Sequence, residues 1–186
     1  MTHKGTVPLE TERLILRRFA EGDAAAMFRN LCGDAKAMRF LPWETHADAA
    51  ETGAHLAGHI AGYISPDYYI WAIVPKDSGE PIGFIYAGAD ETIDAVKIDY
   101  GIGERWWHKG YTAEALAALI RFFFEEIGAN RVWSTHDPRN PNSGKVMQKC
   151  GMTYEGTTRQ TRRRKGEYSD RAIYAVLAED FARQGS

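Results

Sequence analysis

The chain has 186 residues, of which 44% are hydrophobic and 26% charged, as in an ordinary globular domain. Its 23 Lys and Arg against 25 Asp and Glu leave a formal net charge of −2, so the overall charge does not favour binding to nucleic acid or to an anionic membrane. The only cysteines, Cys32 and Cys150, are too few for a disulfide framework or a four-thiolate zinc site, and neither a signal-like N-terminus nor a stretch of about 20 apolar residues occurs. We therefore expect a metal-free cytoplasmic protein that does not enter membranes.

Four strands and two helices are predicted in the first half of the chain. Residues 12–18 alternate between apolar and polar side chains, which favours a first strand. An Ala-rich helix over residues 23–38 follows, and then a second helix that opens with a capping box at Thr45 and Asp48 and ends near residue 63. Three further strands, rich in aromatic and β-branched residues, are expected over residues 69–74, 81–87 and 94–102.

The second half predicts two more helices and three strands. After Gly110 an apolar stripe at helical spacing indicates a helix that ends at Gly128. A strand, a turn-rich loop and a short helix come next, over residues 131–136, 137–142 and 142–150, and two long strands over residues 152–161 and 167–177 flank a turn at Lys165 and Gly166. This order of elements favours an α+β fold with a mixed, partly antiparallel sheet, in a single domain of residues 1–186.

Residues 100–115 run from a strand through a loop into the start of a helix. Such a helix terminus offers unpaired backbone N–H groups and the positive end of the helix dipole to an anion, and Gly110 lets a phosphate approach the backbone. Two common phosphate motifs do not fit. Trp106 stands where a dinucleotide fingerprint starting at Gly101 and Gly103 needs its third glycine, and no Gly-Lys-Ser/Thr triplet occurs. Taken alone, the segment is equally compatible with a turn that uses glycine for steric reasons.

This segment and others resemble the GNAT acyltransferase superfamily, and within it the branch that contains the ribosomal-protein N-terminal acetyltransferases RimJ and RimL. Residues 107–112, Trp-His-Lys-Gly-Tyr-Thr, match the spacing of the superfamily's pyrophosphate loop, Q/R-x-x-G-x-G/A. Residues 9–17 resemble the first strand of the branch. The other matches are Asp137-Pro-x-Asn140-x-x-Ser143 and Lys149-x-Gly151-Met152, which resemble its CoA-contacting loop and fourth helix, and Gly166-Glu-Tyr-x-Asp170 with Tyr174, which resemble its last hairpin.

The resemblance implies a GNAT-type domain with its core at about residues 9–181. It implies a mostly antiparallel mixed sheet that is splayed between its central parallel strands and flanked by about four helices. Acetyl-CoA would be the co-substrate, its pyrophosphate held by backbone amides that the departures at Trp107 and Thr112 leave in place. The implied CoA-binding residues are Gly101, Ile102, Gly103, Trp107, His108, Lys109, Gly110, Tyr111, Thr112, Asn140 and Ser143.

Candidates for the general base lie on two strands. Many members of the family place a glutamate near the position that Lys97 occupies here. Asp99, two residues on and on the same strand face, is our first candidate for the base, and an ion pair with Lys97 is the alternative interpretation. His136, at the end of the neighbouring strand, is a second catalytic candidate, although a single histidine is more often structural.

The general acid and the polarising group are less clearly marked. Many relatives have a tyrosine as acid at the position of Met147. Cys150 is better interpreted as a buried small residue, and Tyr154 is a substitute acid only if it does not pack in the core, so water is left as the other proton source. A backbone N–H of residues 99–102 could polarise the thioester carbonyl.

Two regions bear on the acceptor. Trp43 and Glu44 could supply an apolar wall and an ammonium anchor, or else a loop tryptophan that covers the core and a solvated carboxylate. Acidic residues outnumber lysines between residues 77 and 99, which suits a cationic acceptor, although charge runs are usually solvated. A basic hairpin could contact the CoA 3′-phosphate, RNA or an acidic peptide, but protection from edge pairing is the favoured explanation for its Arg159, Arg162, Arg163, Arg164 and Lys165.

The prediction is therefore an acetyl-CoA-dependent N-acetyltransferase whose acceptor is a primary amine, first of all a protein N-terminal α-amine. A small amine such as an antibiotic, polyamine or amino acid is the alternative acceptor. A CoA-binding module without turnover is the alternative from another class, since the usual tyrosine is missing and the glutamate displaced. Nucleic-acid binding is the weakest reading, and homodimer formation stays open.

Overall fold

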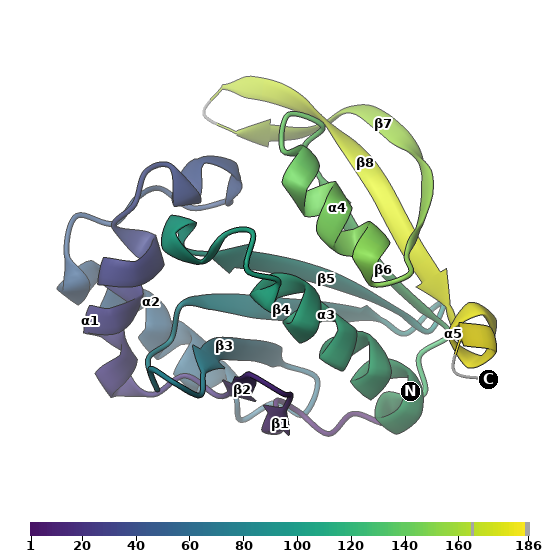
Figure 1. Ribbon diagram of the computed structural model, residues 1–186, viewed down its shortest axis with the longest axis horizontal. Coiled ribbons are helices and arrows are strands. Elements are labelled where there is room, and N and C mark those ends of the chain that lie inside the picture. Colours follow the sequence, from purple (N-terminus) through teal and green to yellow (C-terminus); the bar gives the residue numbers. More distant parts are fainter. Residues whose placement is uncertain (165, 185–186) are drawn as a thin grey trace.

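The computed structural model describes residues 1–164 and 166–184 (Figure 1). Its centre is one mixed sheet in the order β1-β2-β3-β4-β5-β6-β8-β7. The strands are β1 (Leu9–Glu10), β2 (Leu14–Arg17), β3 (Tyr69–Pro75), β4 (Gly83–Asp90), β5 (Ala95–Ile102), β6 (Arg131–His136), β7 (Thr153–Arg164) and β8 (Glu167–Leu177). The helices are α1 (Ala24–Met27), α2 (Ala49–Gly62), α3 (Tyr111–Phe122), α4 (Pro141–Lys149) and α5 (Ala178–Gln184). The predicted α+β class and mixed sheet are confirmed. No helix of the described residues is long and apolar enough to cross a membrane.

The sheet splays at its single parallel pair. All other neighbouring strands are antiparallel, whereas β5 and β6 run parallel and pair only between residues 95–97 and 131–133. Beyond this point β5 stays paired with β4 and β6 stays paired with β8. The second half of β5 is therefore separated from β6, as the family resemblance implies.

Helices cover both faces of the sheet, because the central strands are apolar on both sides. On β3, Trp71 packs in the cluster that contains Leu116 of α3 and Met147 of α4. The preceding residue, Ile70, points to the other face and packs in the cluster that contains Leu31 of the π turn over Phe28–Cys32 and Leu56 of α2. The gap between β5 and β6 thus lies between two separate cores.

The first helical region differs from the prediction of one helix over residues 23–38. It begins with a 3-10 turn and α1, continues as a π turn over Phe28–Cys32 and ends at Gly33. The N–H of Gly33 donates to the carbonyl of Phe28 at 2.9 Å, and a Cβ on Gly33 would lie 2.9 Å from the Phe28 ring. A separate 3-10 turn over Ala37–Phe40 follows. The prediction was wrong because the Ala-rich composition does not reveal this close packing of Gly33 against Phe28.

The N-cap of α2 lies three residues later than predicted. The carboxylate of Asp48 accepts a hydrogen bond from the N–H of Glu51 at 2.8 Å, and the Glu51 carboxylate accepts from the N–H of Ala47 at 2.7 Å. Asp48 is therefore the N-cap and Thr45 precedes the helix. By contrast, the stop at Gly128 is confirmed: a π turn over Phe123–Ile127 extends α3, and Gly128 has a φ of 79°.

Candidate active site

The loop that joins β5 to α3 is fixed to the rest of the fold. The indole N–H of Trp107 donates to the carbonyl of Ile102 at 2.9 Å, and the N–H of Gly103 donates to the carbonyl of Ile82 at 3.0 Å. A Cβ on Gly103 would lie only 1.9 Å from the backbone oxygen of Asn30, so no other residue fits there without a backbone shift. These contacts fix the path of the loop from the end of β5 to the start of α3.

The start of α3 presents unpaired backbone donors. Gly110 is its N-cap, with a φ of 84°, and the N–H groups of residues 108–112 donate to no acceptor within the part of the chain that the structure describes. Arg13 links the loop to α3. Its guanidinium donates to the carbonyl of Lys109 in the loop at 3.0 Å and forms an ion pair with Glu114 of α3 at 2.6 Å. This arrangement is suited to binding an anion.

Tyr100 ties β5 to the first turn of α4. Its hydroxyl lies 3.0 Å from both the carbonyl oxygen and the side-chain oxygen of Ser143. Burial raises the pKa of Tyr100. Two predicted CoA-binding residues of this turn, Asn140 and Ser143, are thereby positioned beside the open end of β5.

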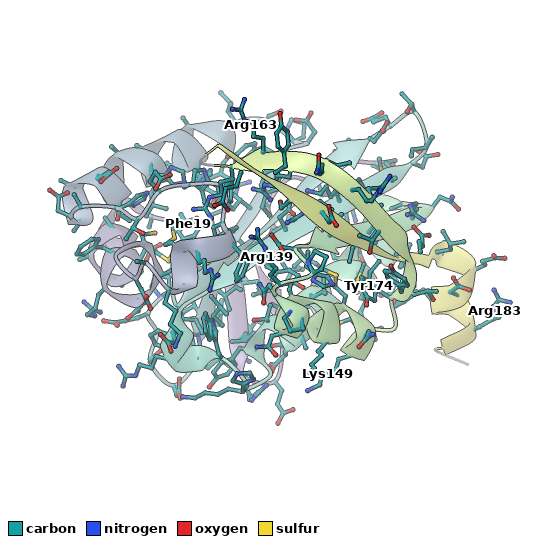
Figure 2. All side chains as sticks on the ribbon, turned by 90° about the horizontal axis from the view of Figure 1, so that it is seen from above. Phe19, Arg139, Lys149, Arg163, Tyr174 and Arg183 are labelled. Carbon is teal, nitrogen blue, oxygen red and sulfur yellow. The ribbon has the colours of Figure 1, made fainter. Side chains whose placement is uncertain are left out.

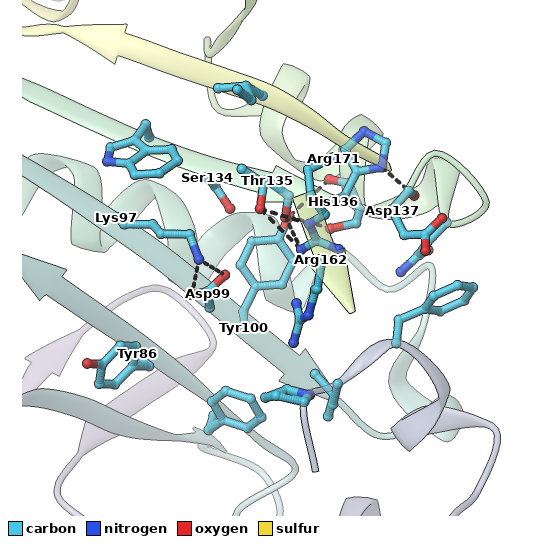
Figure 3. A pocket seen from close by; sticks show the side chains of 18 of the residues that line it. Tyr86, Lys97, Asp99, Tyr100, Ser134, Thr135, His136, Asp137, Arg162 and Arg171 are labelled. Atoms are coloured by element: carbon cyan, nitrogen blue, oxygen red, sulfur yellow. Dashed lines mark hydrogen bonds and ion pairs between the residues drawn. The ribbon is translucent and has the colours of Figure 1, made fainter. Parts of the chain in front are cut away.

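A cavity of about 580 Å³ occupies the splay between β5 and β6 (Figure 3). Its walls come from both sides of the sheet, so it connects the α4 side with the α2 side. It contains the predicted residues Trp43, Asp99, His136, Asn140 and Ser143. Residues that sequence reasoning did not assign to the site also line it: Tyr86, Lys97, Tyr100, Trp133, Thr135, Thr158, Thr161, Arg162 and Arg171.

Asp99 is paired with Lys97 on the floor of the cavity. The Lys97 ammonium donates to both carboxylate oxygens of Asp99, at 2.7 and 3.0 Å. The two side chains remain 34% and 38% exposed, so the carboxylate is accessible from the cavity. The ion pair between Lys97 and Asp99, which was the alternative to a catalytic role, is therefore present. It does not block the Asp99 carboxylate from the cavity.

His136 is enclosed on several sides. One ring nitrogen, Nδ1, lies 2.9 Å from the carbonyl oxygen of Asp137, and the ring centroid is 5.7 Å from that of Tyr174. A Cβ on Gly144 would lie 2.6 Å from the other nitrogen, Nε2. Asp137 is itself paired with Arg139 at 2.7 Å, which holds the pKa of its carboxyl below the usual value. These contacts fix the ring in place.

Of the two residues predicted to bind the acceptor, Trp43 lines the cavity and Glu44 does not. The ring of Trp43 lines the cavity and meets Phe84 and His55 edge-on, at centroid distances of 5.2 and 5.1 Å. Glu44 is exposed and is not among the described residues that line the cavity. Of the acidic stretch over residues 77–99, Asp99 is the member in the lining.

The candidates for the general acid are not placed for that role. Met147 is fully buried. The thiol of Cys150 donates to the carbonyl of Ala113 at 3.2 Å, and burial raises its pKa to about 12. Tyr154 is 52% exposed rather than packed in the core, and its hydroxyl lies 2.8 Å from that of Thr157, outside the described cavity lining. Met147, Cys150 and Tyr154 are therefore all outside the described cavity lining.

The basic side chains of the hairpin differ in exposure, and protection of the edge strand β7 from pairing stays a prediction for the exposed ones. Arg164 donates to three carbonyls of the segment before α2, those of Arg39, Met38 and Trp43, the last at 2.8 Å. Arg162 points into the cavity (Figure 3), whereas Arg163 lies on the outer side of the hairpin (Figure 2). Lys165, which was grouped with them, lies outside the described residues.

Arg171 was missed by the sequence reasoning. It lies on β8 beside Ala172, and its guanidinium donates to the side-chain and carbonyl oxygens of Thr135 at 3.1 and 3.3 Å. The available signal was a charged residue next to the apolar run 172–177 of a long strand. A charged residue in a partly buried strand indicates either a hydrogen-bonding or ion-pair partner or a ligand-binding site.

Comparison with known proteins identifies the family of the chain. The acetyltransferase (GNAT) domain matches residues 13–153, and the chain belongs to this family. The uncharacterized N-acetyltransferase YoaA of Bacillus subtilis is 26% identical over 170 residues, which cover 91% of this chain and 96% of YoaA. The [ribosomal protein uS5]-alanine N-acetyltransferase of Escherichia coli is 27% identical, with 94% and 93% covered.

Solved structures share the fold. A GNAT-family acetyltransferase from Bacillus anthracis has a TM-score of 0.82 and 23% identity, with 93% of this chain and 99% of that one covered. RimL, a ribosomal L7/L12 α-N-protein acetyltransferase solved in complex with coenzyme A, has a TM-score of 0.80 and 20% identity, with 92% and 98% covered.

Proposed function

We propose that the chain transfers the acetyl group of acetyl-CoA to a primary amine. The observation that carries this proposal is the cavity at the β5–β6 splay, which opens both toward the start of α4 and toward Asp99 on the opposite side of the sheet. A thioester that arrives from one side and an amine that arrives from the other would meet between the two strands.

The CoA moiety would be held at the two helix starts. Backbone N–H groups of residues 108–112 would receive the pyrophosphate, and the left-handed Gly110 would let it come close without a Cβ in the way. Asn140 and Ser143 would donate or accept hydrogen bonds along the pantetheine arm. Neither Trp107 nor Thr112, which depart from the family motif, removes a backbone donor.

The thioester carbonyl would be polarised by the backbone of β5. The hydroxyl of Ser134 donates to the carbonyl of Ile98 at 2.6 Å, so the backbone groups of Ile98 face the gap. Because backbone groups alternate along a strand, those of Tyr100 face the gap as well. The N–H of Tyr100 is therefore the donor that we assign to the developing oxyanion.

The demand on a base depends on the acceptor. Neutralising a lysine side chain at pH 7 costs about 4–5 kcal/mol, but an α-amine only about 1 kcal/mol. An α-amine therefore needs only a weak base, for which Asp99 is placed in the cavity. The amine nitrogen would attack the carbonyl carbon, the C–S bond would break, Asp99 would take the amine proton directly or through water, and water would protonate the thiolate.

Two acceptor classes are supported by different observations. A protein N-terminal α-amine is supported by the similarity to the uS5-alanine N-acetyltransferase. A small amine is supported by Arg164, whose hydrogen bonds to Met38 and Trp43 join the hairpin to the opposite wall of the cavity. Such a bridge would restrict the entry of a peptide more than that of a small amine.

The test has two stages. Isothermal titration of acetyl-CoA into the protein should give a dissociation constant in the micromolar range or below, and absence of binding would contradict the proposal. Free-thiol release is then measured with N-terminal peptides, ribosomal proteins and small amines. Acceleration by at least one acceptor is expected, whereas binding without any acceleration would support a CoA-binding module instead.

A further inference from the structure

Two arginines of the last hairpin, Arg162 and Arg171, face the cavity on the side where Asp99 lies. Figure 3 shows both side chains turned toward the interior, with Arg171 beside Thr135 and Arg162 next to it. We call Arg162 and Arg171 the arginine pair. Burial lowers the pKa of Arg171, and the charge of Arg162 lowers it further, which places the two like charges near each other.

An irregularity in β7 brings the pair together. Thr158 is opposite Arg171 and Arg162 is opposite Ser169, so β7 uses four residue steps where β8 uses two. In a regular ladder Arg162 would stand two positions farther along, roughly 7 Å away. The bulge also brings Thr161 to the cavity wall together with Thr158, and their hydroxyls lie 2.9 Å apart.

The bulge is held by specific contacts. Gln160 has a φ of 54°, which is unfavourable for a residue with a side chain. Its N–H donates to the carboxylate of Asp170 at 2.9 Å. Bulges of this kind often re-aim side chains next to active sites.

The arginine pair has no carboxylate in direct contact among the described residues, although Asp99 and Asp137 lie near enough to attract Arg171. Asp99 is already paired with Lys97 and Asp137 with Arg139. Among the described residues no carboxylate lies within ion-pair distance of Arg162 or Arg171, and the latter bonds only to oxygens of Thr135. Two adjacent guanidinium groups in a partly desolvated cavity are suited to a bidentate anion.

We propose that the arginine pair is a subsite for a carboxylate on the acceptor, so that the preferred substrate is an amine that also carries a carboxylate. This inference rests on the proposed function. The amine would face Asp99 and the carboxylate would face the guanidinium groups, with the hydroxyls of Thr158 and Thr161 beside them. The carboxylate is either the α-carboxylate of a free amino acid or the side chain of an acidic N-terminal residue. The charge of this cavity therefore differs from the cationic preference that residues 77–99 suggested.

The experiment measures binding and turnover separately, with the protein saturated with CoA for calorimetry and with acetyl-CoA for thiol release. One arm compares free alanine, glutamate and phenylalanine with their α-amides. The other compares C-terminally amidated peptides that begin with Glu with peptides that begin with Gln. We expect the carboxylate member to bind about 10- to 100-fold more tightly in one arm. A preference for free amino acids over their amides would identify the α-carboxylate as the group bound. A preference for Glu over Gln peptides would identify an acidic N-terminal side chain.

Variants then assign the effect. Arg162→Gln should remove most of the discrimination and leave acetyl-CoA affinity unchanged, whereas Arg162→Lys should retain part of it. Arg163→Gln is the matched control, since Arg163 is the next residue and its guanidinium lies 5.6 Å from the exposed Tyr168 ring. Equal binding of acid and amide in both arms, no binding in either, or equal losses in Arg162→Gln and Arg163→Gln would overturn the subsite.

Failure of the subsite and failure of the proposed function give different results. Turnover with equal rates for acid and amide would remove the subsite and keep the acetyltransferase. Selective binding of the carboxylate member without thiol release from any acceptor would keep the subsite and remove the proposed reaction.

Discussion

At the scale of single residues, Asp99 is a carboxylate of the cavity lining with two roles open to it. Asp99 accepts hydrogen bonds from Lys97, which fixes its orientation, and it faces the space that an amine would enter. A purely structural pair would contribute little, because partly exposed ion pairs are worth about 0–1 kcal/mol. A catalytic role must therefore be visible in the rate and its pH dependence rather than in stability.

Asp99→Asn should lower kcat by about tenfold for an α-amine acceptor, since only about 1 kcal/mol is needed to neutralise such an amine at pH 7. The dissociation constant for acetyl-CoA should stay near the wild-type value. Steady-state rates between pH 6 and 9 and calorimetry give the two quantities. Lys97→Gln is the control, because it removes the ion pair and keeps the carboxylate. An unchanged pH–rate profile in Asp99→Asn would show that Asp99 is not the base.

At the scale of elements, the β5–α3 loop is positioned by close packing and not by side-chain hydrogen bonds alone. Gly103 passes against the backbone of Asn30, and Gly110 has the left-handed conformation that turns the chain into α3. The helix terminus that we assign to the pyrophosphate thus depends on a contact with the π turn that contains Asn30.

Gly103→Ala should lower the free energy of unfolding by at least about 2 kcal/mol, because its Cβ would collide with a backbone oxygen that has little room to move. Gly58→Ala is the matched control. Gly58 lies in α2 with no heavy atom within 4 Å of its added Cβ, so the same change should stabilise the protein by about 0.5–1 kcal/mol. Urea denaturation of both variants provides the comparison, and similar stabilities would mean that the loop can shift freely.

At the scale of the whole molecule, a row of histidines joins α2 to the sheet beside the cavity. His55 and His59 lie 3.2 Å apart through their Nε2 atoms, and Nδ1 of His59 is 2.6 Å from the hydroxyl of Tyr68. Burial and the neighbouring His55 lower the pKa of His59 to about 4, and burial lowers that of His55 as well. Both side chains therefore favour the neutral form in the folded protein.

The stability of the fold should consequently fall as the pH is lowered from about 6.5 to about 4. In this range the unfolded chain takes up protons on these histidines, whereas the folded protein does not until the pH approaches the value of about 4 for His59. Above pH 6.5 the contribution is complete. Because His59 is partly exposed, we expect a loss of about 1–2 kcal/mol.

Urea denaturation of wild type and His59→Gln at several pH values measures this effect, and the variant should show the smaller slope. His108→Asn is the control, since His108 is exposed, has a φ of 61° and occupies a conformation that Asn tolerates. Identical slopes for wild type and His59→Gln would exclude His59 as the cause.

Local patterns in the sequence were enough to match the family loop and to predict the glycine stop of α3 and every described strand except β1. Period-two alternation, helical spacing and glycine conformations act over a few neighbouring residues, so they can be seen without the fold. The same reasoning placed the cap of α2 at Thr45 instead of Asp48 and extended the first helix past Gly33, because which donor is satisfied depends on how the chain turns in space.

The tertiary structure alone decided which charges meet in the cavity. The five basic residues of the hairpin are alike in the sequence, yet Arg162 faces the cavity, Arg163 faces outward and Arg164 bonds to Trp43, 121 residues away. The reason is physical: a bulge changes the register of β7, and the partners of a charged group come from strands far apart in the chain. The balanced composition concealed an excess of positive charge at one end of the site.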